Sequence, residues 1–383
     1  MNLDDPVLQS LNFLNEVVDR YPKSISFAPG APHERFFAGI SVARYIDRYC
    51  DHLRGKGFTD SEVRRRLYQY GPSRGLINDL IANALRCDEG IEVGPESIVV
   101  TVGCQEALFV TLRALGCDAV GIVDPSYVGV AGAARVLGID IVPVRDLTRL
   151  DGFPVLYVAP DFANPTGNRM SLAARQRLLA DARRRGVILL EDNAYGFTAA
   201  DHLPPLKALD TSGQVIHFGT FAKTCFPGAR VGFVVADQPG LADAIATVKS
   251  MVTVNTSALS QAVIGGMLLE HGGSINAMAR GKAVLYRRNL RMLLDAMDRH
   301  LTGLPITWNR PAGGFFVVAT LPVPVTDELL EHCADSFGVI WTPMRHFHLG
   351  GGGTHALRLA CSYLDPEDIE EGVIRLARFV EAL

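Results

Sequence analysis

Short, nearly continuous apolar runs alternate with longer helical patterns through the middle of this 383-residue chain. The runs are rich in valine and isoleucine, which is typical of strands that are covered on both faces. The alternation predicts an α/β fold with a mostly parallel sheet flanked by helices. The predicted strands are Ile98–Val102, Ala119–Val123, Ile141–Val144, Val155–Val158, Val187–Glu191, Val215–Gly219 and Val231–Val235, and the predicted helices between them are Gln105–Leu115, Tyr127–Leu137 and Leu172–Arg185.

The pattern changes after Asp237. Two long helices are predicted over Gly240–Glu270 and Ile275–His300, and the tail then mixes strands and helices. This order predicts a smaller α+β domain beside the large one, with the large domain over residues 38–275 and the small domain over 1–37 and 276–383. The tail's predicted strands are Gly314–Ala319, Val339–Trp341 and Ala356–Ala360, and its predicted helices are Asp327–Phe337 and Pro366–Ala382.

Composition narrows the class of protein. Lys and Arg total 37 against 41 Asp and Glu, a formal net charge of −4, and this mild acidity disfavours a dedicated nucleic-acid binder. The 48% hydrophobic and 20% charged residues are ordinary for a globular protein and argue against long disorder or a coiled coil. No apolar stretch approaches the roughly 20 residues that span a bilayer. Seven unclustered cysteines and an acidic N-terminus predict buried, reduced thiols and a cytoplasmic protein.

A lysine directly after a predicted strand gives the sharpest chemical signal. Its apolar neighbours would partly desolvate the amine, and desolvation lowers the pKa of a lysine, so that the neutral amine can attack a carbonyl. A solvated surface loop is the other interpretation of this segment taken alone. The segment reads Gly219-Thr220-Phe221-Ala222-Lys223-Thr224-Cys225-Phe226-Pro227-Gly228-Ala229-Arg230.

Two carboxylates, Glu191 and Asp192, end another predicted strand, and Tyr195 follows three positions later. In open α/β sheets the carboxyl ends of the strands border the ligand crevice. A helix cap or a solvated strand end is the commoner role for such a pair. The functional alternative is a buried aspartate that keeps a ring nitrogen protonated.

Three further signals are weak when taken singly. Asn164 lies in a turn, Ala163-Asn164-Pro165-Thr166-Gly167, of typical turn formers. A strand runs through Gly103 into a helix at Thr101–Gln105, and the free N–H groups of such a junction bind anions. Arg358 stands in an apolar predicted strand and needs an anionic partner, either an internal carboxylate or one from a ligand.

In this order and at these spacings, the Asn-Pro-Thr-Gly, Glu-Asp-x-x-Tyr and Lys-x-x-x-Pro-Gly-x-Arg elements become specific. From about Phe27 to Phe379 the chain resembles the class I/II aminotransferases, the fold-type-I enzymes that use pyridoxal 5′-phosphate (PLP). The resemblance implies an enzyme that moves the amino group of an α-amino acid to a 2-oxo acid by a ping-pong mechanism through a Lys223 Schiff base.

The resemblance also implies a role for each residue of the motifs. Lys223 matches the lysine that holds the cofactor and moves the substrate's α-proton, and Asp192 the partner of the pyridine nitrogen. Tyr195 and Asn164 match hydrogen-bond partners of the cofactor's 3′-oxygen. The residues that match the phosphate-binding turn are Gly103, Cys104 and Gln105, with Thr220 and Arg230 beside them. Tyr127 matches the ring that stacks on the pyridine. Arg358 matches the residue that binds the substrate's carboxylate, and Gly30 would lie beside it.

The family implies a homodimer in which Tyr70 reaches the phosphate of the neighbouring site. Three departures weaken a subfamily assignment: Ala222 replaces a serine, Cys104 replaces Ser or Ala, and Leu76-Ile77 replaces Leu-Arg. The substrates are amino acids and 2-oxo acids, with no membrane or nucleic-acid partner expected. The side-chain type of the amino acid stays open.

Three rival interpretations remain. A PLP-dependent lyase, decarboxylase or oxidase would use the same scaffold, since the bond that breaks depends on its angle to the ring. A PLP-sensing regulator would need a DNA-binding domain, for which the roughly 26 residues before Phe27 are too few. A nucleotide-binding protein without PLP could use the Gly103 turn.

Three histidines, His346, His348 and His355, lie around the glycine-rich loop 350–353. Their density suggests a metal site, but no cysteine or carboxylate completes a ligand set in the sequence, so no metal is predicted. A mobile loop with incidental histidines is the favoured interpretation. A role for His346 or His348 at the substrate side-chain pocket stays open.

Overall fold

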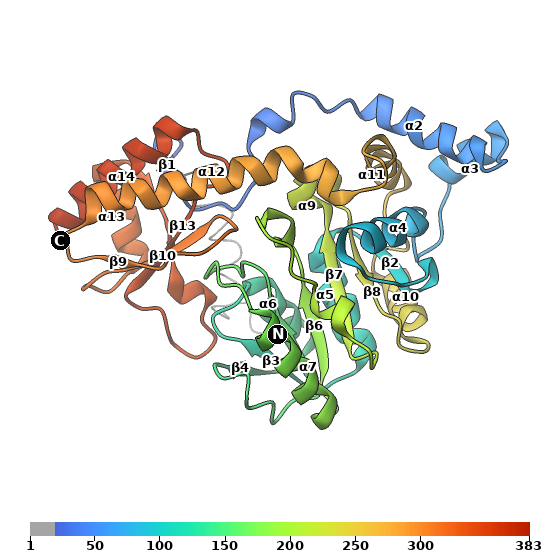
Figure 1. Cartoon of the computed structure of the whole chain (residues 1–383), viewed down its shortest axis with the longest axis horizontal. Helices are drawn as coiled ribbons and strands as arrows, with labels where there is room; N and C mark the ends of the chain where they lie inside the picture. Colours follow the sequence, from blue (N-terminus) through green and yellow to red (C-terminus); the bar gives the residue numbers. More distant parts are fainter. Residues whose placement is uncertain (1–19) are drawn as a thin grey trace.

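The computed structural model describes residues 20–383 and forms two packed parts (Figure 1). Residues 1–19 of the predicted small domain lie outside the described residues. The described strands are β1 (Ile25–Ser26), β2 (Ile98–Thr101), β3 (Ala119–Val123), β4 (Asp140–Val144), β5 (Val155–Val158), β6 (Ile188–Asp192), β7 (Val215–Thr220), β8 (Gly232–Val235), β9 (Thr307–Trp308), β10 (Phe316–Thr320), β11 (Val339–Ile340), β12 (Thr342–Pro343) and β13 (Ala356–Ala360).

Helices connect these strands. The α-helices are α2 (Val42–Gly55), α3 (Asp60–Tyr68), α4 (Asn78–Glu89), α5 (Gly103–Leu115), α6 (Val128–Leu137), α7 (Leu172–Arg185), α8 (Leu206–Leu209), α9 (Phe221–Thr224), α10 (Leu241–Val252), α11 (Ala258–Glu270), α12 (Ile275–Leu301), α13 (Asp327–Phe337) and α14 (Pro366–Glu381). Short 3-10 turns are η1 (Glu34–Phe36), η2 (Pro95–Ser97), η3 (Gly196–Thr198), η4 (Pro227–Ala229) and η5 (Met344–Phe347).

A seven-stranded sheet in the order β2-β8-β7-β6-β5-β3-β4 forms the centre of the larger part. The pairs β7/β6, β6/β5, β5/β3 and β3/β4 are parallel, whereas β8 runs antiparallel to both of its neighbours. The predicted α/β class and the mostly parallel sheet are confirmed. Parallel pairing sets the carboxyl ends of β5, β6 and β7 along one edge, where ligands bind in sheets of this kind.

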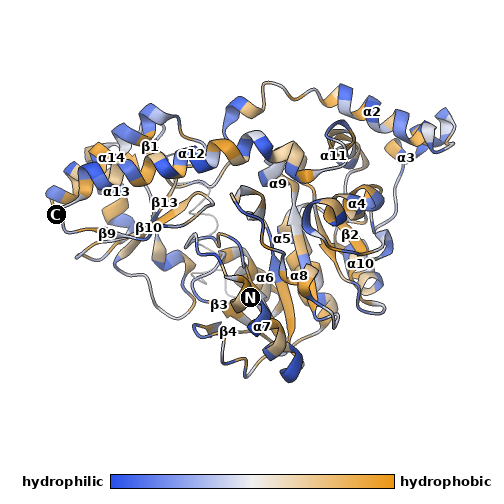
Figure 2. Ribbon diagram, in the orientation of Figure 1, coloured by the Kyte–Doolittle hydropathy of each residue, from blue (hydrophilic) through white to orange (hydrophobic). Residues whose placement is uncertain are grey.

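The apolar runs lie inside because both faces of the sheet are covered. Ile98 and Val100 of β2 pack into a cluster with α2, α4 and α11, whereas Val99 between them packs with α5, α6 and α10. Figure 2 shows the hydrophobic residues gathered on these strands. A strand with both faces buried loses the alternation of polar residues, which is why the sequence shows continuous apolar runs.

The single helix predicted over Gly240–Glu270 is wrong, because the structure has two helices, α10 and α11, separated by residues 253–257. Val254 in this break has a φ of 64°, a left-handed conformation that is unusual for a β-branched residue. Ser257 then caps α11, its side chain accepting a hydrogen bond from the N–H of Ser260. A cap within an apolar, helix-like pattern leaves little trace in the periodicity.

The smaller part combines a four-stranded sheet, β12-β13-β10-β9, with the pair β1-β11. Ile25 pairs with Val339, so the N-terminal segment joins the C-terminal strands. The long helix α12 packs against α14 at one end and α9 at the other, and thus runs along both parts (Figure 1). The domain boundaries at residues 37 and 275 stay a prediction.

The cysteines differ from the expectation of uniform burial. All seven are free thiols, but Cys87 is exposed, and Cys104 and Cys117 are only partly buried. Within the described range, no helix combines the length and the apolar character needed to cross a membrane.

Helix α11 packs closely on α2, and we expect the substitution Gly266→Ala to destabilise the fold. A Cβ at Gly266 would lie 1.9 Å from the carbonyl oxygen of Tyr45, a backbone atom that moves only with its helix. Overpacking of this kind costs about 1–3 kcal/mol. Thermal unfolding should show a lowered Tm, while Gly39→Ala, where a Cβ meets no atom within 4 Å, serves as the control. Equal melting temperatures of the two variants would contradict this packing.

Candidate active site

A cavity of about 210 Å³ opens at the carboxyl edge of β5, β6 and β7, where the two parts of the chain meet. It brings together all the predicted site residues except Gly103 and Tyr70. Its lining residues are Gly30, Cys104, Gln105, Tyr127, Tyr157, Ala159, Asn164, Asp192, Ala194, Tyr195, Thr220, Ala222, Lys223, Arg230, Phe316 and Arg358.

Lys223 extends into this cavity from α9, the single turn that follows β7. Its Nζ donates a hydrogen bond to the carbonyl oxygen of Gly30, 2.6 Å away. Burial and the positive charges of Arg358 and Arg230 together lower the pKa of the amine to about 8, against an opposing effect of Asp192. A large fraction of this amine is therefore neutral near pH 8, as a nucleophile or a proton acceptor requires.

Asp192 ends β6 and is buried. Its Oδ2 accepts a hydrogen bond of 2.6 Å from the hydroxyl of Tyr157 on β5, while its Oδ1 is buried without a partner. Burial raises the pKa of this carboxyl group, although the Tyr157 hydrogen bond opposes the rise. An unpartnered buried carboxylate oxygen at a cavity calls for a donor, and a positively charged donor satisfies it best.

The start of α5 and Arg230 form a basic corner of the cavity. Gly103, the first residue of α5, has a φ of 75° and lies so close to Arg230 that a Cβ would be 2.7 Å from its Nη2. Gly103 therefore shapes this corner without lining the cavity. No side chain caps the first N–H groups of α5, and those groups with a nearby guanidinium suit an anion such as a phosphate.

Arg358 on β13 lies on the opposite side of the cavity. Its Nη1 donates to Oδ1 of Asn164 at 2.7 Å, and its Nη2 donates to the carbonyl oxygen of Ala28. The guanidinium is sandwiched at 4.7 Å between the rings of Phe316 and Phe347, and its buried Nε has no partner. Burial lowers its pKa to about 10, so the group stays charged at neutral pH, and its hydrogen-bond partners among residues 20–383 are the neutral Asn164, Ala28 and Thr342.

Only glycine fits at position 30, beside Arg358, because a Cβ there would lie 2.8 Å from the ring of Phe316. Two tyrosines complete the wall: Tyr127 donates its hydroxyl to Oε1 of Gln105 at 3.2 Å, and Tyr195 meets the Phe316 ring edge-on at 5.5 Å between centroids. Burial raises the pKa of both tyrosines, which therefore stay protonated and able to donate.

Sequence reasoning missed several lining residues. Tyr157 belongs to the apolar run predicted as a strand, and the only sign of its role in the sequence is that a hydroxyl in a buried strand needs a hydrogen-bond partner. Phe316 follows Gly313-Gly314 in a predicted strand, and nothing in its spacing indicates that it would contact Gly30 and Arg358. Ala159 and Ala194 carry no chemical signal.

Two groups of predicted residues lie away from the cavity. Tyr70 is 84% exposed and borders a separate surface hollow with Arg64 and Tyr68. His346 pairs with Asp327 at 2.9 Å, and His348 Nδ1 lies 3.4 Å from Asp124 Oδ1. Over residues 20–383, no group of three or more His, Cys, Asp and Glu side chains could hold a metal ion.

The chain belongs to the aminotransferase class I and II family, whose model matches residues 59–376. Among curated relatives, the (S)-3,5-dihydroxyphenylglycine transaminase of Amycolatopsis orientalis is 47% identical over 408 residues, covering 100% of this chain and 93% of the relative. The 2-aminoadipate transaminase of Thermus thermophilus is 32% identical, covering 94% and 91%. The protein is an aminotransferase, which the relatives support over the lyase, decarboxylase and oxidase alternatives.

Solved structures agree with this assignment. The alpha-aminoadipate aminotransferase of Thermus thermophilus, crystallised with N-(5′-phosphopyridoxyl)-L-leucine, is 29% identical and has a TM-score of 0.79, covering 98% of this chain and 97% of that one. A multiple substrate aminotransferase of Thermococcus profundus is 25% identical, with a TM-score of 0.83 and coverage of 100% and 96%. The fold is that of the fold-type-I PLP enzymes, and PLP is the cofactor.

The cavity fits PLP on its own geometry. The unpartnered Oδ1 of Asp192 suits a protonated ring nitrogen, and the corner formed by α5 and Arg230 suits a phosphate. Lys223 offers an amine of lowered pKa between these two ends, and Arg358 offers a free Nε beyond it. The donors and acceptors of the cavity therefore match the two charged ends and the aldehyde of this cofactor.

In cofactor-free protein, we expect Lys223 to react with amine-directed reagents around pH 8. Burial and the charges of Arg358 and Arg230 keep this amine neutral at a lower pH than an ordinary lysine, so its labelling rises through that range. Reductive methylation at a series of pH values, followed by mass spectrometry, measures the midpoint for each peptide. The exposed Lys56 provides the reference curve. A Lys223 midpoint no lower than that reference would contradict the argument.

Proposed function

We propose that Lys223, Asp192 and Arg358 carry the amino transfer, with an aryl-substituted α-amino acid of the phenylglycine class as amino donor or product. One observation carries the proposal. A buried amine, a carboxylate oxygen without a partner and a guanidinium with an unused N–H donor share one cavity. These are the groups that amino transfer needs at the amine, the cofactor ring and the substrate carboxylate.

When bound, PLP supplies an aldehyde that takes up the amino group and a ring that accepts electron density from the substrate's Cα. Lys223 would hold the aldehyde end of the cofactor through its Nζ. The pKa of this amine is lowered to about 8, so the neutral amine could also accept the proton from the substrate's Cα and give it back on the other side of the transfer. The first substrate would leave as a 2-oxo acid before the second binds.

Asp192 and the residues near the 3′-oxygen would set the charge of the cofactor ring. The unpartnered Oδ1 of Asp192 would accept the hydrogen of the ring nitrogen, and its negative charge would keep that nitrogen protonated. The Tyr195 hydroxyl would donate to the 3′-oxygen. The Oδ1 of Asn164 is taken by Arg358, which leaves the amide nitrogen to donate to the same oxygen.

The two ends of the cavity hold the two anionic groups. The N–H groups of Gly103, Cys104 and Gln105 at the start of α5, the hydroxyl of Thr220 and the guanidinium of Arg230 would hold the phosphate, and the Tyr127 ring in the cavity wall would offer an aromatic face to the pyridine. Arg358 binds the substrate's α-carboxylate through its free Nε and the hydrogens that its present partners do not use. A rigid clamp of this kind orients Cα over the cofactor.

The substrate class rests on the relative that shares 47% of residues over the whole chain, a (S)-3,5-dihydroxyphenylglycine transaminase. Phe316 and Phe347 on either side of Arg358 provide an apolar, aromatic setting next to the carboxylate clamp. An aryl group attached directly at Cα would lie near Phe316, the one of these two rings that lines the cavity, where an aromatic contact favours it.

We expect (S)-3,5-dihydroxyphenylglycine or 4-hydroxyphenylglycine to give a kcat/KM at least about tenfold above that of 2-aminoadipate or alanine with 2-oxoglutarate as acceptor, a difference of about 1.4 kcal/mol. Release of the aryl 2-oxo acid by chromatography measures each rate. Lys223→Ala should lower every rate by about 10²- to 10⁴-fold, because it removes both the tether and the proton carrier. A donor profile led by 2-aminoadipate would refute the substrate class, and full turnover by Lys223→Ala would refute the role of Lys223.

We further propose a homodimer in which Tyr70 of one subunit reaches the phosphate end of the other site. Tyr70 and its neighbour Tyr68 are 84% and 72% exposed, which is costly for large aromatic side chains on a free surface. Met251 and Val254 are also exposed, at 83% and 49%. Free cysteines throughout the chain support a cytoplasmic, reducing location.

We expect mixed dimers to distinguish this arrangement. Tyr70→Ala removes a donor from the partner's site, and Lys223→Ala removes the amine from its own, so a mixed dimer contains one complete site. Co-refolding the two inactive variants in equal amounts should restore about a quarter of wild-type activity, since half of the dimers are mixed and each has one working site. If hybrid dimers form but activity does not return, the proposed role of Tyr70 is contradicted. Mixing either variant with itself is the control.

A further inference from the structure

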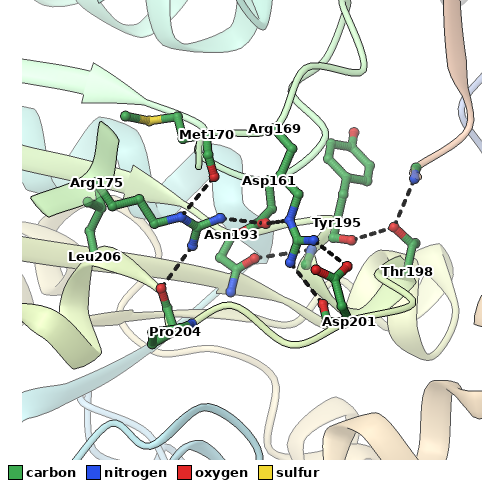
Figure 3. Close-up of polar contacts among 12 residues, drawn as sticks. Asp161, Arg169, Met170, Arg175, Asn193, Tyr195, Thr198, Asp201, Pro204 and Leu206 are labelled. Atoms are coloured by element: carbon green, nitrogen blue, oxygen red, sulfur yellow. Dashed lines mark hydrogen bonds and ion pairs between the residues drawn. The ribbon is translucent and has the colours of Figure 1, made fainter. Parts of the chain in front are cut away.

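Asp161 forms the centre of a buried charge cluster at a second cavity (Figure 3). Its Oδ1 accepts from Nε of Arg169 at 2.7 Å and from Nη2 of Arg175 at 2.6 Å. Arg169 extends onward to Asp201, its Nη1 donating to Oδ1 at 2.7 Å and its Nη2 to the carbonyl oxygen at 3.0 Å. Arg175 extends to the carbonyl oxygen of Pro204 at 3.0 Å.

The cluster ties together two segments that carry site residues. Asp161 and Arg169 bracket the turn that holds Asn164, and their ion pair closes that turn. Asp201 and Pro204 lie in the loop that begins with Tyr195 after β6. One carboxylate oxygen therefore fixes the Asn164 turn to the Tyr195 loop through two guanidinium groups (Figure 3).

Burial makes the ion pairs of Asp161 with Arg169 and Arg175 costly to break. The side chains of Arg175, Asp161 and Arg169 are 0%, 5% and 12% exposed, whereas Asp201 is 74% exposed. Two arginines and two aspartates balance to zero net charge, and Glu89 beside them adds little charge at neutral pH, because burial and Asp161 raise the pKa of Glu89 to about 8. Removing one charge from a buried pair leaves its partner uncompensated in a poorly hydrated place, and the surrounding segments must move. Exposed ion pairs carry no such penalty.

Thr198 fastens the near end of the same loop. Its hydroxyl donates to the carbonyl oxygen of Tyr195 at 2.7 Å and accepts from the N–H of Gly314 at 3.1 Å. The loop is thus fixed to the smaller part at Thr198 and to the Asn164 turn through the Asp161 cluster. The second connection relates Tyr195 to Asn164 from outside the cavity, whereas inside it the two residues are related through Phe316 and Arg358.

We propose that Asp161 is a positioning residue that holds the Asn164 and Tyr195 donors at a fixed separation and thereby sets the proton affinity of the Lys223 nitrogen in the loaded enzyme. The inference rests on the proposed function, in which both donors meet the cofactor's 3′-oxygen. Charge on that oxygen stabilises a proton on the nearby Lys223 nitrogen, and donors to the oxygen weaken that effect. A looser pair of donors therefore raises the proton affinity.

Other groups around Lys223 stay unchanged in the variants below. The charged and titratable groups that face it are Asp192 and Tyr195 with β6, Arg230 after η4, Arg358 on β13, Tyr157 on β5, and Tyr127 and Cys104 near α5 and α6. Asp161, Arg169 and Asp201 line a second cavity of about 250 Å³ and are not in the lining of the first. A shift at Lys223 would therefore arise from displacement of the donors.

The test is a pH titration of the PLP-loaded protein, followed by the visible absorbance of the cofactor. Asp161→Asn should raise the midpoint at which the Lys223 nitrogen loses its proton by about half a pH unit or more. The same variant should lower kcat/KM about tenfold or more, as small misplacements of catalytic groups do. Arg169→Gln leaves the Arg175–Asp161 pair intact and should raise the midpoint by a smaller amount. If Asp161→Asn does not fold, the midpoint of Arg169→Gln tests the proposal in its place.

Two reference variants separate the outcomes. Asp151→Asn breaks an exposed pair with Arg185 and should leave the midpoint at the wild-type value. Tyr195→Phe removes one donor directly and should raise the midpoint. A raised midpoint in Tyr195→Phe with wild-type midpoints in Asp161→Asn and Arg169→Gln overturns the inference and leaves the proposed function intact. An unmoved midpoint in Tyr195→Phe overturns the proposed role of Tyr195, and the inference with it.

Discussion

The buried guanidinium of Arg358 joins four segments of the chain at the active site. It comes from β13, donates to Asn164 of the larger part and to Ala28 of the N-terminal segment, and lies 3.3 Å from the hydroxyl of Thr342 on β12. A charge that has lost its water must find partners, and here these are neutral oxygens and two aromatic faces. The remaining positive charge is therefore available to an anionic substrate, and the contact also fixes how the two parts meet.

The electrostatics of the cavity follow from this arrangement. Arg358 and Arg230 line the cavity with Lys223, and their positive charges lower its pKa, with Asp192 as the counter-charge. Burial strengthens each of these effects because little water screens them. The same desolvation that lowers the pKa of Lys223 raises that of Asp192 when no cationic partner is present. A cofactor with a phosphate at one end and a protonated nitrogen at the other meets both needs.

Most of the fold was predictable because both faces of the central sheet are buried. Strands β2 to β7 lie within one or two residues of the predicted runs, since hydrophobicity marks such strands clearly. The break at residues 253–257 was not predictable, because it depends on a left-handed Val254 and a Ser257 cap inside an apolar pattern. The roles of the lysine, aspartate and arginine motifs followed from resemblance. The place of Tyr157 and Phe316 in the active site was not predictable, because aromatic residues in apolar strands usually belong to the hydrophobic core.

From the residues alone came the strands of the central sheet, the family, the cofactor and the polar residues that stand at strand ends. The helices α2, α3 and α4 and the division of α10 from α11 came from the structure, as did the contacts among the polar residues. The antiparallel direction of β8, the contact between Asn164 and Arg358, and the Asp161 cluster join residues that lie far apart in the chain or on different loops. Spacing along a chain reports local periodicity, whereas pKa shifts and partner choice depend on distances that only the packed chain defines.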